Sequence, residues 1–230
     1  MNSHLIEKAL KIKLNQDQIE KFQKYYKHLV DFNTHTNLTR ITDEKEVYIK
    51  HFLDSVLISN LVDFNEINTI CDMGAGAGFP SVPLLIVFPH LKVTIVESQI
   101  KRVKFLNELQ EILGITFEVV HERAEVYAKN NLNKFDCVTA RALGELNLIL
   151  EYGIPMLKVN GYFIAPKGSK YQEEIAHAQN ALKVLQSEIV KISTFDLIEE
   201  SGFRANILIK KRAHVSGYPR EYARIVKKPL

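Results

Sequence analysis

The sequence predicts an α/β fold in which a mostly parallel, seven-stranded sheet is covered by helices and preceded by a helical extension. Two patterns support this prediction. From Ile67 onward, short apolar runs alternate with helical stretches, which is the order expected of parallel strands joined by helical crossovers. Three alternating glycines, Gly74, Gly76 and Gly78, follow the first apolar run, as at a strand-to-helix turn whose backbone approaches a ligand.

The first 65 residues are predicted to form helices that pack on the sheet. Apolar residues recur at steps of three and four between residues 16 and 30, where no Gly or Pro occurs. The stretch 33–37 is expected to break this helix. Thr42 is the expected N-cap of a second helix that runs toward Ser59, with acidic residues in its first turn.

Strands and helices are expected to alternate through the rest of the chain. The predicted strands are 69–73, 92–96, 116–120, 135–139, 161–166, 189–197 and 205–210. Helices are predicted to start near Phe79 and to cover 100–113, 124–129 and 171–185. We therefore divide one structural domain into a helical extension (1–65), a Rossmann-like core (66–212) and a basic tail (213–230).

Composition limits the functional class. The chain has 230 residues, 46% hydrophobic and 25% charged, as in a globular protein with one large domain. Its start lacks a cationic segment followed by an apolar run, and no stretch has the ~18 apolar residues of a membrane span, so we expect a cytoplasmic protein without membrane contact. Cys71 and Cys137 lie in predicted buried strands as reduced thiols, and the histidines lack ligand spacing, so no metal site is expected.

Positive charge is concentrated at the C-terminal end. From Arg204 to Leu230 the chain has eight Lys or Arg residues and one acid, Glu221, although its overall net charge is only +3. A basic end on a mildly acidic body favours a polyanionic partner such as RNA. A solvated tail that keeps the protein soluble is the alternative.

The spacing of the glycines selects the ligand. A dinucleotide fingerprint, G-x-G-x-x-G, would need glycine at position 79, where this chain has Phe79. A Walker loop is also excluded, because no Gly-Lys-Ser/Thr follows. Alternating glycines after an acidic strand end, Asp72, instead suit an adenosine ligand without a pyrophosphate, such as S-adenosylmethionine. A glycine-rich structural turn is the alternative.

Polar residues follow the next predicted strands, at the edge where ligands of open parallel sheets bind. Glu97 ends the second strand, where its carboxylate can accept both hydroxyl protons of an adenosine ribose. A surface glutamate beside Lys101 and Arg102 is the alternative. After the third strand, Ala124 and Glu125 lie where an adenine ring would sit, although the same residues can cap the next helix.

Two cations end the fourth and fifth strands. Arg141, at the mouth of an apolar strand, requires an anion, which is the methionine carboxylate, an RNA phosphate or a structural acid such as Glu145. Lys167 can hold an RNA phosphate or stabilise charge on a target base, although exposed lysines are common at such turns. We interpret both as catalytic residues that act by positioning and electrostatics.

The fourth strand end lacks two patterns of methyl-transfer chemistry. The Asp/Asn-Pro-Pro-aromatic motif of exocyclic-amine methylation is absent, and so is the nucleophilic cysteine of carbon-5 pyrimidine methylation, since Cys137 lies inside the strand. A nucleophile with a free lone pair and no proton, such as guanine N7, needs no general base. Catalysis would then depend on positioning and electrostatic support.

Together these residues resemble the RsmG (GidB) family of bacterial small-subunit rRNA guanine-N7 methyltransferases, over nearly the whole chain. The motifs behind the resemblance are Asn37-Leu38-Thr39, His51 with Asp54-Ser55, the loop 72–80, the segment 101–106, Arg123 with Glu125, Arg141-Ala142, Lys167-Gly168, Tyr218-Pro219-Arg220 and the ending 227–230. Two positions depart from the family pattern. Ser81 replaces a common glycine, and 221–226 replaces a more basic stretch.

The resemblance implies a Rossmann-like class I methyltransferase that uses S-adenosylmethionine to methylate N7 of one guanine in 16S rRNA. Its partner is then 16S rRNA, free or in the small ribosomal subunit, and we expect a monomer. The resemblance assigns cofactor contacts to Gly74, Phe79, Ala124, Glu125 and Arg141, beside our own assignment of Gly76, Gly78 and Glu97. As residues on the RNA side we expect Asn37, His51, Lys101, Arg102, Lys104, Lys167, Arg220, Lys227 and Lys228.

Three other functions stay open. The chain can be a class I methyltransferase for a different RNA, protein or small molecule, but the basic residues at 101–104 and in the tail weigh against a non-RNA substrate. It can be a ribosome- or RNA-binding module with a vestigial cofactor site, but the intact glycine loop with Glu97 argues against that. An NAD-dependent dehydrogenase is disfavoured by Phe79.

Overall fold

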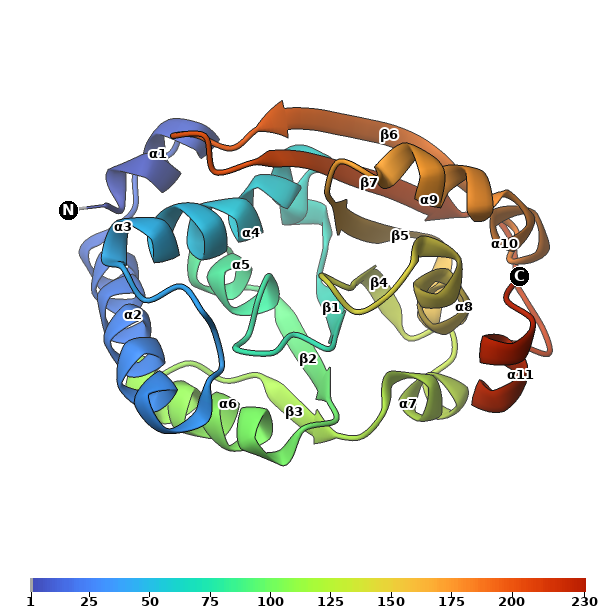
Figure 1. Ribbon diagram of the computed structural model, residues 1–230, viewed down its shortest axis with the longest axis horizontal. Helices are drawn as coiled ribbons and strands as arrows, with labels where there is room; N and C mark the ends of the chain where they lie inside the picture. Colours follow the sequence, from blue (N-terminus) through green and yellow to red (C-terminus); the bar gives the residue numbers. More distant parts are fainter. Residues whose placement is uncertain (1) are drawn as a thin grey trace.

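The computed structural model describes residues 2–230 and has a seven-stranded sheet at its centre, with helices on both faces (Figure 1). The strands are β1 (Thr69–Met73), β2 (Lys92–Glu97), β3 (Glu118–His121), β4 (Phe135–Thr139), β5 (Leu157–Lys167), β6 (Ser187–Asp196) and β7 (Phe203–Lys211). In space they follow the order β3-β2-β1-β4-β5-β7-β6. The order reverses between β1 and β4, which places a ligand crevice at their carboxyl ends.

The sheet is mostly parallel, as predicted. Strands β1 to β5 run parallel, while β7 is antiparallel to both β5 and β6. Met73 pairs with Val96 in the register of β1 and β2. Gly74 follows Met73, and Glu97 follows Val96 as the last residue of β2, so the glycine loop and Glu97 meet at the same edge of the sheet.

Two cores form on the two faces of the sheet, since alternate strand residues point to opposite sides. On β1, Ile70 belongs to one core and Cys71 and Met73 to the other. The first core lies beneath α5 (Ser81–Val87), α6 (Ile100–Leu113) and the N-terminal helices. The second lies beneath α7 (Ala124–Asn130), α8 (Leu146–Met156), α9 (Tyr171–His177) and α10 (Gln179–Val184).

The N-terminal helices, drawn in blue to cyan in Figure 1, pack on α5 and α6. They are α1 (His4–Leu10), α2 (Gln16–Thr36), α3 (Glu44–Val47), a π-helical turn (Tyr48–Leu53), α4 (Asp54–Val56) and a 3-10 turn (Leu57–Asn60). The predicted break at 33–37 is wrong, because α2 continues to Thr36 and ends at Asn37 with φ +53°. Asp43, and not Thr42, caps α3, since its carboxylate accepts from the Glu46 amide at 3.0 Å.

Several element boundaries also differ from the prediction. Helices α1, α8 and α11 (Tyr222–Lys227) were not predicted. Helix α5 begins at Ser81 and not at Phe79, and the predicted helix over 171–185 divides at Ala178. Strand β3 begins at Glu118, two residues later than predicted, and β5 extends back to Leu157.

Helix α8 escapes prediction because it contains Gly153 and Pro155, two residues that usually interrupt helices. The structure explains the glycine. A Cβ on Gly153 would overlap the buried Phe163 ring of β5, with Cδ2 2.6 Å away. The glycine therefore lets α8 pack closely on β5.

We predict that Gly153→Ala destabilises the protein, although glycine-to-alanine changes inside helices normally stabilise. The added methyl group must displace Phe163, which is fully buried, and overpacking of this kind costs about 1–3 kcal/mol. Urea unfolding followed by circular dichroism measures the change. Gly168→Ala is the matched control, because a Cβ there meets nothing within 4 Å. Equal midpoints for the two variants would contradict the packing argument.

Candidate active site

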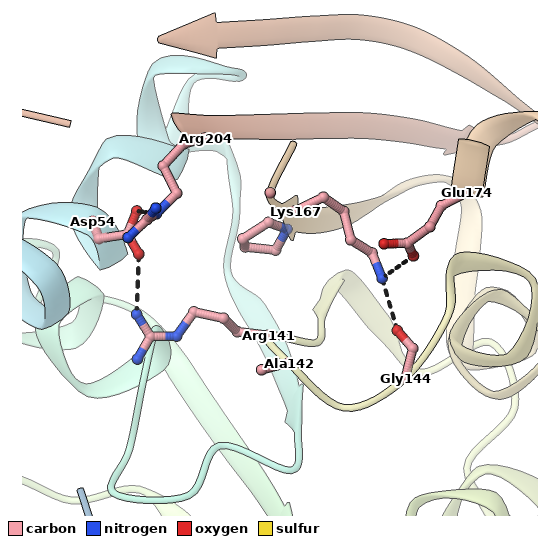
Figure 2. Close-up of a pocket in the computed structure, with 9 residues that line it drawn as sticks. Asp54, Arg141, Ala142, Gly144, Lys167, Glu174 and Arg204 are labelled. Carbon is pink, nitrogen blue, oxygen red and sulfur yellow. Dashed lines mark hydrogen bonds and ion pairs between the residues drawn. The ribbon is translucent and has the colours of Figure 1, made fainter. Parts of the chain in front are cut away.

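Three neighbouring cavities lie along the carboxyl edge of the sheet. The loop cavity, of about 180 Å³, lies between the glycine loop 74–77, Thr39, His51 and Arg141. The rim cavity, of about 410 Å³, is lined by charged residues from α4, β4, β5, α9 and β7 (Figure 2). The tail cavity, of about 240 Å³, lies between α7, α8 and α11. The segment 141–144, which follows β4, contributes to all three.

The glycine loop has the backbone conformation that its sequence predicts. Gly74, Gly76 and Gly78 have φ values of +69°, +61° and +92°, which residues with a Cβ rarely adopt. A Cβ on Gly78 would lie 2.8 Å from the hydroxyl of Tyr25, so this glycine is required by packing. A Cβ on Gly76 would meet nothing within 4 Å. Gly76 therefore faces open space at the loop cavity, where a ligand can approach the backbone.

Glu97 is buried, and the alternative of a surface glutamate is wrong. Glu97 is the last residue of β2 and is only 2% exposed to solvent. One carboxylate oxygen accepts from the Gly76 amide at 3.1 Å and the other from the Gln99 amide at 2.9 Å, while Arg102 lies 3.6 Å away. Each carboxylate oxygen has a second acceptor site. Glu97 thus supports the glycine loop and can also accept from the hydroxyl groups of a ribose.

Asp72, the last but one residue of β1, fixes the start of α5. It is fully buried, and its Oδ2 accepts from the Ser81 amide at 3.1 Å, whereas Oδ1 has no hydrogen-bond partner within residues 2–230. Burial raises the pKa of Asp72 to about 7. The carboxyl group therefore holds the turn that contains the three glycines between β1 and α5.

Phe79 brings two other predicted residues together at the loop cavity. The imidazole of His51 stacks on its ring with centroids 4.6 Å apart, and the guanidinium of Arg141 lies 5.0 Å from the ring centroid. His51 Nδ1 lies 3.2 Å from the Lys50 carbonyl oxygen and Nε2 lies 3.0 Å from the Thr39 hydroxyl. Because a carbonyl only accepts, we assign the proton to Nδ1, and Nε2 then accepts from Thr39.

His51 is held in its neutral form. Burial, with a further contribution from the positive charge of Arg141, lowers the pKa of His51 to about 3. The ring therefore offers a neutral, flat surface beside the glycine loop. Asn37, like His51, is a predicted RNA-side residue. It ends α2 just before Leu38 and Thr39, two residues that line the loop cavity.

The rim cavity contains a carboxylate that binds two arginines (Figure 2). Asp54 Oδ2 lies 3.3 Å from Arg141 Nη1, and Oδ1 lies 3.0 Å from Arg204 Nε. The side chain of Asp54 is 7% exposed. Asp54 is thus the structural partner of Arg141, in place of the Glu145 that the sequence suggested as an example. The triad keeps one net positive charge beside the cavity.

Lys167 is also held in an ion pair. Its ammonium group donates to the Gly144 carbonyl at 2.7 Å and lies 2.6 Å from Glu174 Oε2, and its side chain is only 8% exposed. Glu174 also accepts from the Leu146 amide at 2.9 Å. Lys167 therefore ties the segment after β4 to α9, and it is not the exposed lysine of the alternative interpretation.

The tail cavity contains Ala124 and Glu125, the two residues expected near an adenine ring. Glu125 is 6% exposed, and Arg123 Nε donates to its carboxylate. The sequence did not predict that Tyr222 and Val226 of α11 line the same cavity. Their spacing of four residues, which puts two apolar side chains on one helix face, was the available signal.

The remaining predicted RNA-side residues do not gather at one place. Lys101 and Lys104 are exposed on α6, and Lys227 and Lys228 are exposed at α11. These helices pack on opposite faces of the sheet, since the buried residues of α6 belong to one core and Ile225 of α11 to the other. Arg220 instead binds Glu151, whose side chain is fully buried, at 2.6 and 2.7 Å.

The described residues 2–230 contain no group of three or more His, Cys, Asp or Glu side chains arranged to hold a metal ion. Both cysteines, Cys71 and Cys137, are buried and free. Within the same residues, no helix is long and apolar enough to cross a membrane.

The cavities fit S-adenosylmethionine. Gly76 leaves space for close approach at the loop cavity, and the buried carboxylate of Glu97 next to it is the acceptor that a ribose needs. The tail cavity offers apolar walls and the polar edge of Glu125 to a flat base. Glu97, Gly76, Phe79 and Glu125 would therefore hold the cofactor.

We predict that Glu97→Gln raises the dissociation constant of S-adenosylhomocysteine about tenfold to a hundredfold, because hydrogen bonds to a charged group are worth about 1.5–3 kcal/mol. Isothermal titration calorimetry gives the constant, and circular dichroism checks the fold. Glu111→Gln, on the exposed side of α6, is the control. Wild-type affinity in Glu97→Gln would remove Glu97 from the site.

We also predict a pH effect on stability. The pKa of His51 is about 3 in the folded chain and ~6.5 when unfolded, so the unfolded state takes up a proton between these values. The free energy of unfolding therefore falls as the pH decreases from 6.5 to 3. His51→Gln should reduce this slope by up to about 1.4 kcal/mol per pH unit.

Urea unfolding at pH 4.5, 5.5, 6.5 and 7.5 tests the slope, and His35→Gln at an exposed position is the control. If the wild type and His51→Gln lose stability in parallel as the pH decreases, the neutral, buried state of His51 is wrong.

Comparisons with known proteins show the family of this chain. The family model described as "rRNA small subunit methyltransferase G" (GidB) matches residues 18–201. Proteins named ribosomal RNA small subunit methyltransferase G are 62% identical in Acholeplasma laidlawii, over 98% of both chains, and 49% identical in Staphylococcus haemolyticus, over 95% of this chain and 92% of the relative.

Solved structures of methyltransferases share the fold. M. jannaschii TYW2 in complex with AdoMet has a TM-score of 0.53 and 14% identity, over 64% of this chain and 70% of that one. A ribosomal protein L11 methylase from Lactobacillus delbrueckii has a TM-score of 0.53 and 17% identity, over 71% and 79%. The predicted resemblance is confirmed: the chain belongs to the GidB family of rRNA small subunit methyltransferase G, enzymes that use S-adenosylmethionine.

Proposed function

We propose that this chain transfers a methyl group from S-adenosylmethionine to N7 of a guanine in 16S rRNA. The names of the relatives refer to small-subunit ribosomal RNA. The guanine N7 position is what the resemblance to the family implies, and the chemistry of the site supports it. The substrate places the enzyme in the cytoplasm, where we propose that it acts as a monomer whose segments 1–65, 66–212 and 213–230 form one structural domain.

One observation supports N7 as the target atom. The titratable side chains that line the rim cavity are paired with one another: Asp54 with Arg141 and Arg204, and Lys167 with Glu174. A carboxylate in such a pair is a poor proton acceptor. Guanine N7 has a lone pair and no proton, so its methylation requires no base. An exocyclic amine or a hydroxyl group would require one.

The rim cavity is the proposed place of the target base. It adjoins the loop cavity, because Arg141 and Ala142 line both. Its lining offers carboxylate acceptors and ammonium or guanidinium donors, which suit the N1–H and N2–H donors and the O6 acceptor of guanine. When bound, S-adenosylmethionine supplies an electrophilic methyl group. The role of the protein is to hold the base in line with the methyl group and the sulfur atom, and to exclude water.

The RNA backbone needs contacts outside the cavities. We propose that Asn37, His51 and the basic residues Lys101, Arg102 and Lys104 contact RNA near the loop cavity, with Lys167 at the rim and Lys227 and Lys228 at α11. Arg220 and Lys167 are both bonded to acids, Glu151 and Glu174. We keep Lys167 because it lines the rim cavity, and we leave Arg220 out because it lines none of the three cavities.

The test uses small ribosomal subunits from a strain that lacks this gene. Wild-type enzyme with S-adenosylmethionine should make one guanine sensitive to borohydride and aniline, which break the chain at N7-methylguanine, and primer extension should map one stop. Lys167→Met should slow this modification at least tenfold, because its ammonium lies at the rim cavity and also holds the segment after β4 in place. Methyl incorporation without a chain break would refute N7. Cofactor binding without RNA methylation would favour a different substrate.

A further inference from the structure

We infer that the C-terminal helix α11 forms the outer wall of the adenine site, with Tyr222 and Val226 as its contact residues. This inference rests on the proposed use of S-adenosylmethionine. It gives the tail a role in cofactor binding, where the sequence suggested only an RNA contact or a solvated end.

The first observation is a group of apolar side chains around one cavity. Leu143, Tyr222 and Val226 are 38%, 44% and 52% exposed, and all three line the tail cavity. What distinguishes these three from other exposed apolar side chains is that they gather around one cavity. A flat aromatic ligand would cover them, and the buried carboxylate of Glu125 next to them supplies a polar contact for its edge.

The second observation is that α11 is held firmly in this position. Ile225 is fully buried in the core beneath α7 and α8. Before the helix, Arg220 binds the buried Glu151, and Lys129 of α7 lies 2.5 Å from Glu221. The Arg220–Glu151 pair is largely buried and fixes geometry, whereas Glu221 in the second pair is exposed. The helix is therefore a fixed part of the cavity wall.

The third observation connects α11 to the residues that the sequence places beside adenine. The guanidinium of Arg123 lies 4.4 Å from the Tyr222 ring centroid, and its Nε donates to Glu125. Arg123, Glu125 and Tyr222 all line the tail cavity. Tyr222 is thus joined through Arg123 to Glu125, which we assign to the base.

The position of the cavity identifies its occupant as the base and not the methionine end. Ser98, which follows Glu97, lines the tail cavity, whereas the glycine loop and Arg141 line the loop cavity. A ligand whose ribose reaches Glu97 would place one end in each cavity. The tail cavity joins large apolar side chains from α8 and α11 to the carboxylate of Glu125, which suits the face and the edge of a base, so the adenine lies against α11.

A fluorescent reporter tests this placement directly. The chain contains no tryptophan, so Tyr222→Trp introduces a single one at the cavity wall. We expect S-adenosylhomocysteine to change its emission in a saturable way. Arg224→Trp is the matched control, because Arg224 is exposed two residues along α11 and points away from the side of Tyr222. Its emission should stay constant during the same titration.

Affinity provides the second measurement. Tyr222→Ala should raise the dissociation constants of both S-adenosylhomocysteine and methylthioadenosine about tenfold, in the range found for aromatic contacts with bases. Tyr222→Phe should bind like the wild type, and so should Arg224→Ala. Methylthioadenosine lacks the amino-acid end of S-adenosylhomocysteine. If both ligands lose affinity by the same factor, the lost contact is one to the adenosine part of the ligand.

The outcomes separate this inference from the proposed function. If the wild type fails to bind S-adenosylhomocysteine, the proposed function itself is wrong. If the wild type binds, while Tyr222→Ala keeps its affinity within twofold and Tyr222→Trp shows no emission change, α11 is not the wall of the adenine site. Circular dichroism of each variant confirms that it is folded before the affinities are compared.

Discussion

Asp54 joins three parts of the chain that are far apart in sequence. It comes from the N-terminal extension, and its two oxygens bind Arg141 at the end of β4 and Arg204 on β7. A carboxylate so little exposed is stable only with charged partners, so the extension can pack on the sheet only where these arginines meet it. This contact also brings His51, on the preceding helical turn, to the glycine loop.

The segment after β4 is held at both ends by such contacts. At one end Arg141 binds Asp54, and at the other the Gly144 carbonyl accepts from Lys167, which is paired with Glu174. Between them, Leu143 lies against Gly74. Because this segment contributes to all three cavities, its ion pairs set the distance between the cofactor side and the target side. A reaction that depends on alignment of two reactants needs a wall of this rigidity.

The parts of the fold that the sequence predicts are those with local causes. The glycine loop and the ranges of β1 and β4 follow from spacing and apolar runs within a few residues. Contacts between distant residues leave no such pattern: Asp54 lies 87 residues before Arg141. The sequence therefore identified Arg141 as a cation that needs an anion, but not which one. Gly153 is similar, since only the position of Phe163 explains it.

The basic tail shows why a count of charges overstates RNA affinity. Of the eight cations between Arg204 and Leu230, Arg204, Arg212 and Arg220 bind Asp54, Glu188 and Glu151. The ammonium of Lys211 donates to the Asn133 side chain and to two backbone carbonyls, and burial lowers its pKa to about 8.

Only cations that neutralise phosphates release counterions and strengthen RNA binding. Four of the eight basic residues at this end are thus structural. Of the other four, Lys210 lies on β7 with its ammonium 5.4 Å from the Tyr162 ring centroid, and Arg224, Lys227 and Lys228 are the exposed cations of α11 and its end. A helix with these cations and an apolar pair at Tyr222 and Val226 can contact RNA with some residues and the cofactor with others. The charge pattern that suggested an RNA-binding tail and the apolar pair that forms the cavity wall therefore belong to one short helix.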